Sequence, residues 1–137
     1  MKKIILLIAI ATFSLGCSSD DSDKSVNIEQ QIAGKWRNVS QKNNNTPVTL
    51  SECELKNTYS FSNPLKQFFA EVNSTNAQNE CEENILLGTY NLSGNSCSIT
   101  VNNETVILND ISFSGEVMTT NEMDGPIKVT RTWIKTN

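Results

Sequence analysis

The sequence predicts an all-β protein, an eight-stranded antiparallel up-and-down barrel, preceded by a cleaved N-terminal segment and a disordered acidic tether. From Gly34 onward, short β-branched or aromatic runs alternate with turn signals. Most of these turns, such as Asn102-Asn103, are short enough to join neighbouring strands as hairpins. Eight such strands can close into a barrel with no free edge. A β-sandwich has the same periodicity and remains an alternative.

The first 16 residues have the organisation of a signal peptide. Met1-Lys2-Lys3 is cationic, Ile4 to Leu15 is mostly apolar, and Gly16 precedes Cys17. The apolar run is too short for a spanning helix, which needs about 20 residues. Gly16-Cys17 resembles the lipobox of bacterial lipoproteins, although Ser14 stands where that motif usually has Leu. The resemblance implies that Cys17 carries a lipid and becomes the mature N-terminus; the alternative is ordinary secretion.

Residues 17–27 form the predicted tether. Ser18 to Asp23 contains only Ser and Asp, so it has no apolar side chain to bury and should be disordered. The segment resembles the Ser/Asp tract that follows the lipidated Cys in many Bacteroidetes lipoproteins, which implies display on the cell surface. The alternative is a spacer that faces the periplasm. Either reading predicts an outer-membrane lipoprotein with its folded part outside the cytoplasm.

Composition excludes several functions. The net charge is −4, and it becomes −6 once Lys2 and Lys3 are removed, so we expect no nucleic-acid partner. The chain has no His, which excludes the commonest general base and His-activated nucleophiles. It has no phosphate- or dinucleotide-binding glycine motif. We therefore expect no catalytic residue, no metal and no cofactor; the remaining enzymatic alternative is a carboxylate pair, Glu71 and Glu116.

The expected domain covers residues 28–137, long enough for one core. One or two helical turns over 28–33 come first. The predicted strands then cover residues 34–41, 57–62, 67–73, 85–92, 96–101, 104–109, 111–118 and 126–135. Long connections are expected at 42–56, 74–84 and 119–125, and tight turns at 63–66, 93–95, 102–103 and near 110.

This order of strands predicts two different barrel ends. If the first strand runs upward, all three long connections fall at the top. Gly34, Trp36 and the end of the last strand fall at the bottom, beside tight turns. The top should therefore be an open mouth and the bottom a closed base, and binding residues concentrate on long loops.

Three cysteines remain besides Cys17. In an oxidising compartment a disulfide is expected. Cys53 and Cys81 both fall in top connections, whereas Cys97 follows a bottom turn. A strand of about eight residues, or about 26 Å, separates Cys97 from Cys81. A disulfide tolerates about 7 Å between Cα atoms, so we predict Cys53–Cys81 and a free, partly buried Cys97.

The predicted mouth is acidic. Its long connections contain Glu52, Glu54, Glu80, Glu82, Glu83, Glu122 and Asp124 against Lys42 and Lys56. Such a rim could attract a cationic protein, and Glu80, Glu82 and Glu83 could hold Ca²⁺, although their spacing matches no calcium loop. The alternative is that these acids only aid solubility.

A family resemblance appears at this point. The opening Ile32-Ala33-Gly34-Lys35-Trp36, Cys53, the Phe61 hairpin, Cys81, Gly88-Thr89-Tyr90 and Trp133 together resemble the lipocalin-like domain of Bacteroidetes lipoproteins, a calycin-type small barrel. The likeness covers roughly residues 28–136. It implies a basic residue near the last strand that packs on Trp36, and Arg131 is the candidate. Such a cation–π contact contributes about 1–2 kcal/mol; otherwise Trp36 is simply a large core residue.

The expected function follows from these observations. The two-residue period makes Asn38, Ser40, Tyr90, Leu92, Ile99, Val101, Val129 and Arg131 candidates for the barrel interior. They could line a small apolar cavity or fill a solid core. We expect a membrane-anchored, non-enzymatic, extracytoplasmic binding protein for a small apolar ligand or for a partner at the mouth. The alternative is a protein-interaction module, such as an inhibitor of a basic enzyme.

Overall fold

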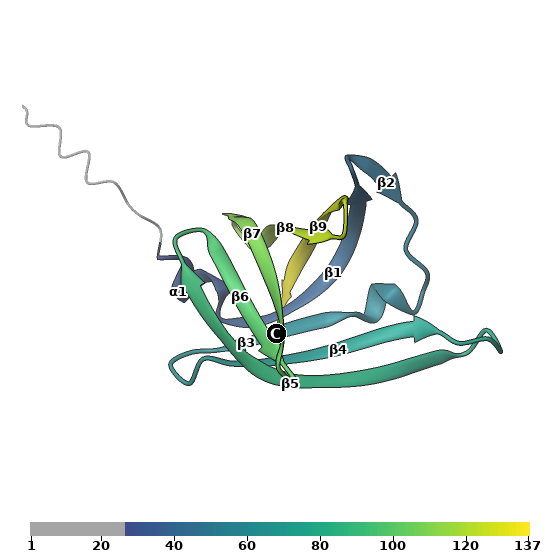
Figure 1. Ribbon diagram of the computed structural model, residues 1–137, viewed down its shortest axis with the longest axis horizontal. Coiled ribbons are helices and arrows are strands. Elements are labelled where there is room, and N and C mark those ends of the chain that lie inside the picture. The colour runs from purple at the N-terminus through teal and green to yellow at the C-terminus, as the bar shows by residue number, and fades with distance from the viewer. Residues whose placement is uncertain (1–26) are drawn as a thin grey trace, which may run out of the picture.

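The computed structural model describes residues 27–137 and confirms the antiparallel barrel (Figure 1). Eight strands close into a ring through the pairing of the first with the last, and β2 is an additional strand on β1. This closure excludes a sandwich. The elements are α1 (Ile28–Ile32), β1 (Gly34–Asn43), β2 (Thr46–Val48), η1 (Glu54–Lys56), β3 (Thr58–Ser62), β4 (Gln67–Thr75), β5 (Cys81–Ser93), β6 (Ser96–Val101), β7 (Glu104–Ser114), β8 (Val117–Asp124) and β9 (Ile127–Thr136).

The predicted signal peptide, the lipidation site Cys17 and most of the tether lie outside the described residues. The only helices within 27–137, α1 and η1, are too short to cross a bilayer.

Two predicted loops are largely strand. β4 and β5 continue through most of residues 74–84 and form a long hairpin that projects from the barrel (Figure 1). The predicted break near 110 is wrong, because β7 runs through Asp110 as a bulge and the hairpin turn lies at Gly115. The predicted loop 119–125 is therefore strand β8 with a tight turn at Gly125. Asp110 adopts φ 48°, which Asp tolerates in a bulge as it does in a turn.

The base of the barrel is closed by α1. Ile32 is fully buried in the core, and its carbonyl accepts a hydrogen bond of 2.7 Å from the Trp36 indole N–H. Lys66, in the β3–β4 turn, forms an ion pair with Glu29 of α1. The hydrogen bond to Ile32 and the ion pair of Glu29 therefore attach α1 to the barrel at both ends of the helix. This confirms the predicted closed base.

The interior carries two tryptophans and one local change of phase. Trp36 and Trp133 are both buried, and the Trp133 indole N–H donates to Thr120 Oγ1 at 3.0 Å. Asn38 is buried as expected, but a bulge between Asn38 and Ser40 leaves Ser40 exposed. The expectation that Ser40 points inward is wrong because a bulge adds one residue and reverses the alternation that follows.

Gly88 lies where β6 crosses closely over β5. A Cβ built on Gly88 would lie 2.1 Å from the Thr100 carbonyl oxygen and 2.8 Å from Val101 Cγ2. The first of these neighbours is backbone and cannot rotate away. A strand glycine commonly marks such a close approach of another chain segment.

Replacing Gly88 by alanine is therefore expected to lower the free energy of unfolding by about 2 kcal/mol, because β6 must move away from β5. The matched control is Gly94→Asn in the β5–β6 turn, where a Cβ meets nothing and Asn tolerates the φ of 57°. Urea denaturation of both variants checks the difference. Equal stability of Gly88→Ala and Gly94→Asn would contradict the close approach.

Candidate functional site

A cavity of about 390 Å³ lies at the mouth end of the barrel. Its walls are apolar side chains from five strands, and its rim is polar. The walls comprise Tyr59, Phe68, Leu86, Ile99, Val101 and Val106, and the rim comprises Asn102, Glu104, Glu122, Met123 and Asp124. A cavity of this size with mostly apolar walls is typical of small-molecule sites.

The alternation of side chains along each strand determines which residues line the cavity. Ile99 lies directly opposite Val106, and Val101 lies opposite Glu104, so both pairs face the interior from the β6–β7 hairpin. Phe68 and Leu86 face the interior from β4 and β5. Phe61, opposite Gly34 at the base, packs against the wall residues Tyr59 and Phe68 and forms the floor below them. The interior is therefore solid at the base and open at the mouth.

A half-buried ion pair stands beside the cavity. The Arg131 guanidinium donates to Glu122 and, through Nε at 3.1 Å, to Gln41 Oε1. Burial raises the pKa of Tyr59, and the Arg131 charge opposes that rise. Arg131 is thus neutralised by its own neighbours, and no Lys or Arg is among the described residues that line the cavity.

The predicted packing of Arg131 on Trp36 is wrong. Arg131 pairs with Gln41, whereas Lys135 lies directly opposite Trp36 in the β1–β9 ladder. Lys135 Nζ stands 5.4 Å from the Trp36 ring centroid. In this register Lys135, four residues further along β9, lies at the base, whereas Arg131 lies nearer the mouth. Gly34 and Trp36 do lie at the base.

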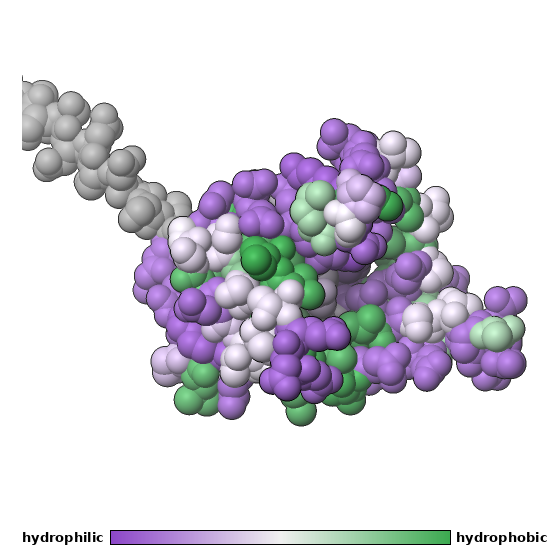
Figure 2. All heavy atoms as spheres, in the orientation of Figure 1, coloured by the Kyte–Doolittle hydropathy of each residue, from purple (hydrophilic) through white to green (hydrophobic). Residues whose placement is uncertain are grey.

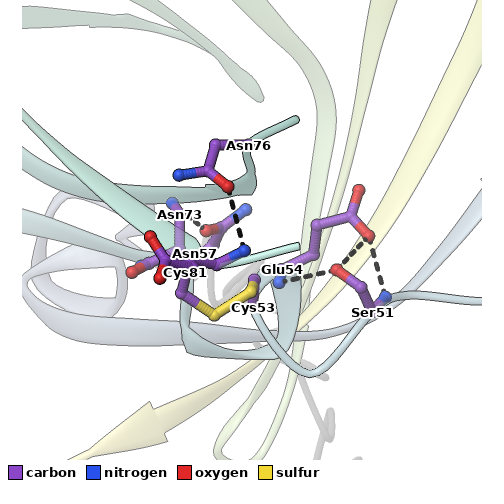
Figure 3. The surroundings of a disulfide bond; sticks show 8 residues. Ser51, Cys53, Glu54, Asn57, Asn73, Asn76 and Cys81 are labelled. Carbon is purple, nitrogen blue, oxygen red and sulfur yellow. Dashed lines mark hydrogen bonds between the residues drawn. A yellow bond between two sulfur atoms is a disulfide. The ribbon is translucent and has the colours of Figure 1, made fainter. Parts of the chain in front are cut away.

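The disulfide forms as predicted. Cys53 and Cys81 are bonded with their Cα atoms 5.5 Å apart, and Cys97 is free and buried. Figure 3 shows the bond beside η1, where Glu54 accepts hydrogen bonds of 2.8 Å from the backbone and hydroxyl of Ser51. On the other side of the disulfide, the Asn57 side-chain oxygen accepts a hydrogen bond from the Asn73 backbone N–H. The bond ties the connection after β2 to the projecting hairpin.

Of the predicted mouth acids, Glu122 and Asp124 line the cavity and the other five do not. Glu52 and Glu54 lie beside the disulfide, and the Glu54 carboxylate accepts a hydrogen bond from Ser51. Glu80, Glu82 and Glu83 are exposed on the projecting hairpin. Within residues 27–137 no cluster of three or more His, Cys, Asp or Glu side chains is placed to hold a metal. Sequence reasoning identified the correct end of the barrel but missed Glu104 and the wall residues Leu86 and Val106, which the two-residue period could have indicated.

The alternative carboxylate pair is separated. Glu71 lies on the outer surface, where it accepts from Lys35 Nζ at 3.0 Å and from the Thr58 hydroxyl at 2.9 Å, and these bonds lower its pKa. Glu116 is exposed in the β7–β8 turn at the base. The two carboxylates therefore do not share a site.

Cys97 should be chemically inert. Burial raises the pKa of its thiol to about 12, and the reactive species is the thiolate. In a chain without Cys17 we expect no reaction with 5,5′-dithiobis(2-nitrobenzoic acid) at pH 8 in the folded state and one equivalent in denaturant. Rapid labelling of the native protein would contradict this burial.

These features agree with a known family. The lipocalin-like domain family matches the chain over residues 32–123, and the chain belongs to that family. Together with the solved structures described next, this confirms the predicted resemblance to Bacteroidetes lipocalin-like proteins. No curated protein matches the chain.

Two crystal structures show the same fold. An uncharacterized protein from Bacteroides eggerthii DSM 20697 has a TM-score of 0.54 and 14% identity, covering 76% of this chain and 98% of its own. A lipocalin-like protein from Bacteroides uniformis ATCC 8492 has a TM-score of 0.54 and 14% identity, covering 77% and 99%. At this identity the similarity concerns the fold alone.

Proposed function

We propose that this lipocalin-like protein is a non-enzymatic, membrane-anchored binding protein that holds a small apolar molecule in the cavity at the barrel mouth. The observation that carries the proposal is the cavity of about 390 Å³, with apolar side chains on its walls and carboxylates at its rim. An apolar ligand would bury both its own surface and that of Leu86, Ile99 and Val106, at about 25 cal/mol per Å².

The charges around the cavity indicate which ligands suit it. Arg131 is already paired with Glu122. Glu104 and Asp124 make no ion pair within residues 27–137 and stand at the rim. An anionic head group would meet these carboxylates, and no Lys or Arg among the residues that line the cavity would offset them. The site therefore favours a neutral or cationic apolar molecule over an anionic one.

The proposed anchor is the lipid on Cys17 of the N-terminal segment. The Cys53–Cys81 disulfide supports an oxidising, extracytoplasmic location, because disulfides persist in such compartments. The outer membrane is the location that the lipobox resemblance implies. Radiolabelled palmitate incorporation that is lost in Cys17→Ala tests the anchor. An unlabelled wild-type protein in the membrane fraction would contradict lipidation.

Two neighbouring substitutions test the cavity. Val106 and Ile107 are about equally exposed, at 49% and 51%, but Val106 faces the cavity and Ile107 faces outward. Val106→Trp should weaken binding of the neutral probe N-phenyl-1-naphthylamine by about tenfold or more, that is by at least about 1.4 kcal/mol. Ile107→Trp should leave the dissociation constant nearly unchanged. Fluorescence titration measures both.

The result would contradict the proposal if Val106→Trp and Ile107→Trp bound the probe equally well, or if wild type bound none. The anionic probe 1-anilinonaphthalene-8-sulfonate should bind wild type more weakly than the neutral probe. Equal affinity for both probes would contradict the role of the rim charges.

A second candidate function is the capture of a basic protein. It is favoured by the projecting β4–β5 hairpin, on which Glu80, Glu82 and Glu83 are all exposed (Figure 1). Hen egg-white lysozyme is a suitable cationic probe. The triple charge reversal to Lys should abolish its binding; unchanged affinity would remove this candidate and leave the cavity proposal untouched.

A further inference from the structure

The first half of β5 has an open strand edge. On one side of β5, β4 pairs with residues Cys81 to Thr89. On the other side of β5, β6 pairs only with residues Thr89 to Ser93. Residues 81–88 thus have a hydrogen-bonded neighbour on one side only, and no other strand within 27–137 pairs with them. Figure 1 shows this half of β5 beside β4 alone. The expectation of a barrel without a free edge is corrected here.

The direction of the backbone groups can be deduced. The Tyr90 N–H donates to the Lys66 carbonyl, which lies on the β4 side of β5. Successive residues of a strand direct their N–H and C=O groups to alternate sides. The even-numbered residues of this segment therefore bond to β4, and Glu83, Ile85 and Leu87 direct theirs to the open edge.

The edge lacks the usual protection. Native edges are normally blocked by Lys, Pro, a bulge or a covering segment. Asn84 to Gly88 has no Lys or Pro and pairs with β4 in unbroken register. Ile85 and Leu87 are 58% and 67% exposed, and Leu87 lies directly opposite Phe69 of β4. Figure 2 shows apolar surface along this side of the molecule.

The charge around the edge is predominantly negative, and the nearby Lys35 is paired with Glu71. No Lys or Arg occurs from Gln67 to Ile127, a stretch that contains nine acidic residues. Only two of these, Glu71 and Glu122, form ion pairs within the described part of the chain. Glu82 and Glu83 are exposed at the beginning of the open edge. A partner that complements this surface must be basic.

We propose that the open edge of β5, from Glu83 to Leu87, binds an extended segment of a partner protein as an added strand, and that this segment alternates basic and apolar side chains. Backbone hydrogen bonds to Glu83, Ile85 and Leu87 supply affinity, and the carboxylates with Ile85 and Leu87 select side chains. A second copy of the chain is a poor occupant, because its own β5 carries the same carboxylates to the contact. This binding mode does not involve the cavity. It would add backbone hydrogen bonds to the capture of a basic protein, the second candidate function.

The probe is the blocked octapeptide acetyl-(Lys-Val)₄-amide, added to the intact protein and followed by amide hydrogen exchange in NMR. The Ile85 and Leu87 amides should exchange freely without peptide and become about tenfold or more protected with it. A peptide of the same charge, N-methylated at every residue so that neither of its edges can form the ladder, should give no protection.

Ile85→Pro supplies the variant on the protein. It removes an edge-directed N–H that β4 does not use, so the barrel should remain folded, as proline is tolerated at strand edges. Octapeptide affinity should fall about tenfold or more, while Ile85→Thr should retain it. N-phenyl-1-naphthylamine binding by Ile85→Pro should equal that of wild type, which separates this inference from the cavity proposal.

Three results would overturn the inference. The first is equal binding of the N-methylated peptide, which would show a contact of charge alone. The second is protection of the Ile85 and Leu87 amides before peptide is added, including protection that grows with protein concentration, which would show that the edge is already covered. The third is no measurable binding of the octapeptide at 50 mM salt.

Discussion

Trp36→Ala is expected to lower the free energy of unfolding by about 3–5 kcal/mol, the largest effect of any substitution considered. The Trp36 ring is buried among residues of the base and packs on Phe113 with ring centroids 5.7 Å apart. Its indole N–H also holds the Ile32 carbonyl of α1. The substitution thus creates a cavity and releases the helix that closes the barrel.

Two controls separate these effects in urea denaturation. Trp36→Phe keeps most of the ring but loses the hydrogen bond to Ile32, and should cost about 1–2 kcal/mol. Leu65→Ala changes a side chain that is 68% exposed and should have little effect. If Trp36→Ala were no more costly than Leu65→Ala, the base would not be the packed region described.

Removal of the disulfide by Cys53→Ser with Cys81→Ser should cost about 3–4 kcal/mol in the chain-entropy account. The bond closes a segment with a sequence separation of 28 residues. It also joins the connection after β2 to the hairpin that carries Glu80, Glu82 and Glu83. Without it, amides of η1 and of the first residues of β5 should lose protection from hydrogen exchange before the rest of the barrel.

Thermal unfolding with and without dithiothreitol checks this prediction. The reductant should lower the melting temperature of wild type and leave the double variant unchanged, because Cys97 has no bonded partner. A wild type whose stability did not respond to reduction would contradict a stabilising role for the bond.

Much of the fold could be predicted because the signals are local. Turn residues such as Gly94 and Asn102-Asn103 mark hairpins, and Cys53 and Cys81 fall at the same barrel end by strand counting alone. The bulges at Asn38–Ser40 and at Asp110 could not be predicted, because they depend on how one strand meets its neighbour. The register error for Arg131 has the same origin.

The site was less accessible from sequence than the fold. Acidic residues in the connections attracted attention, but the cavity is lined by side chains within strands, such as Leu86 and Val106. The pairing of Arg131 with Glu122 joins two strands that the sequence does not distinguish from others. The open edge of β5 depends on a difference in length between β5 and β6, which only the paired structure shows.

Native mass spectrometry tests the central claim, that the cavity at the mouth binds a small apolar molecule. Wild type, Val106→Trp and Ile107→Trp would each be incubated with an apolar extract of bacterial membranes and then desalted. We predict a retained small mass on wild type and on Ile107→Trp that disappears on denaturation and is absent from Val106→Trp. A bare wild-type protein, or the same retained mass on Val106→Trp while circular dichroism shows all three folded, would contradict the claim.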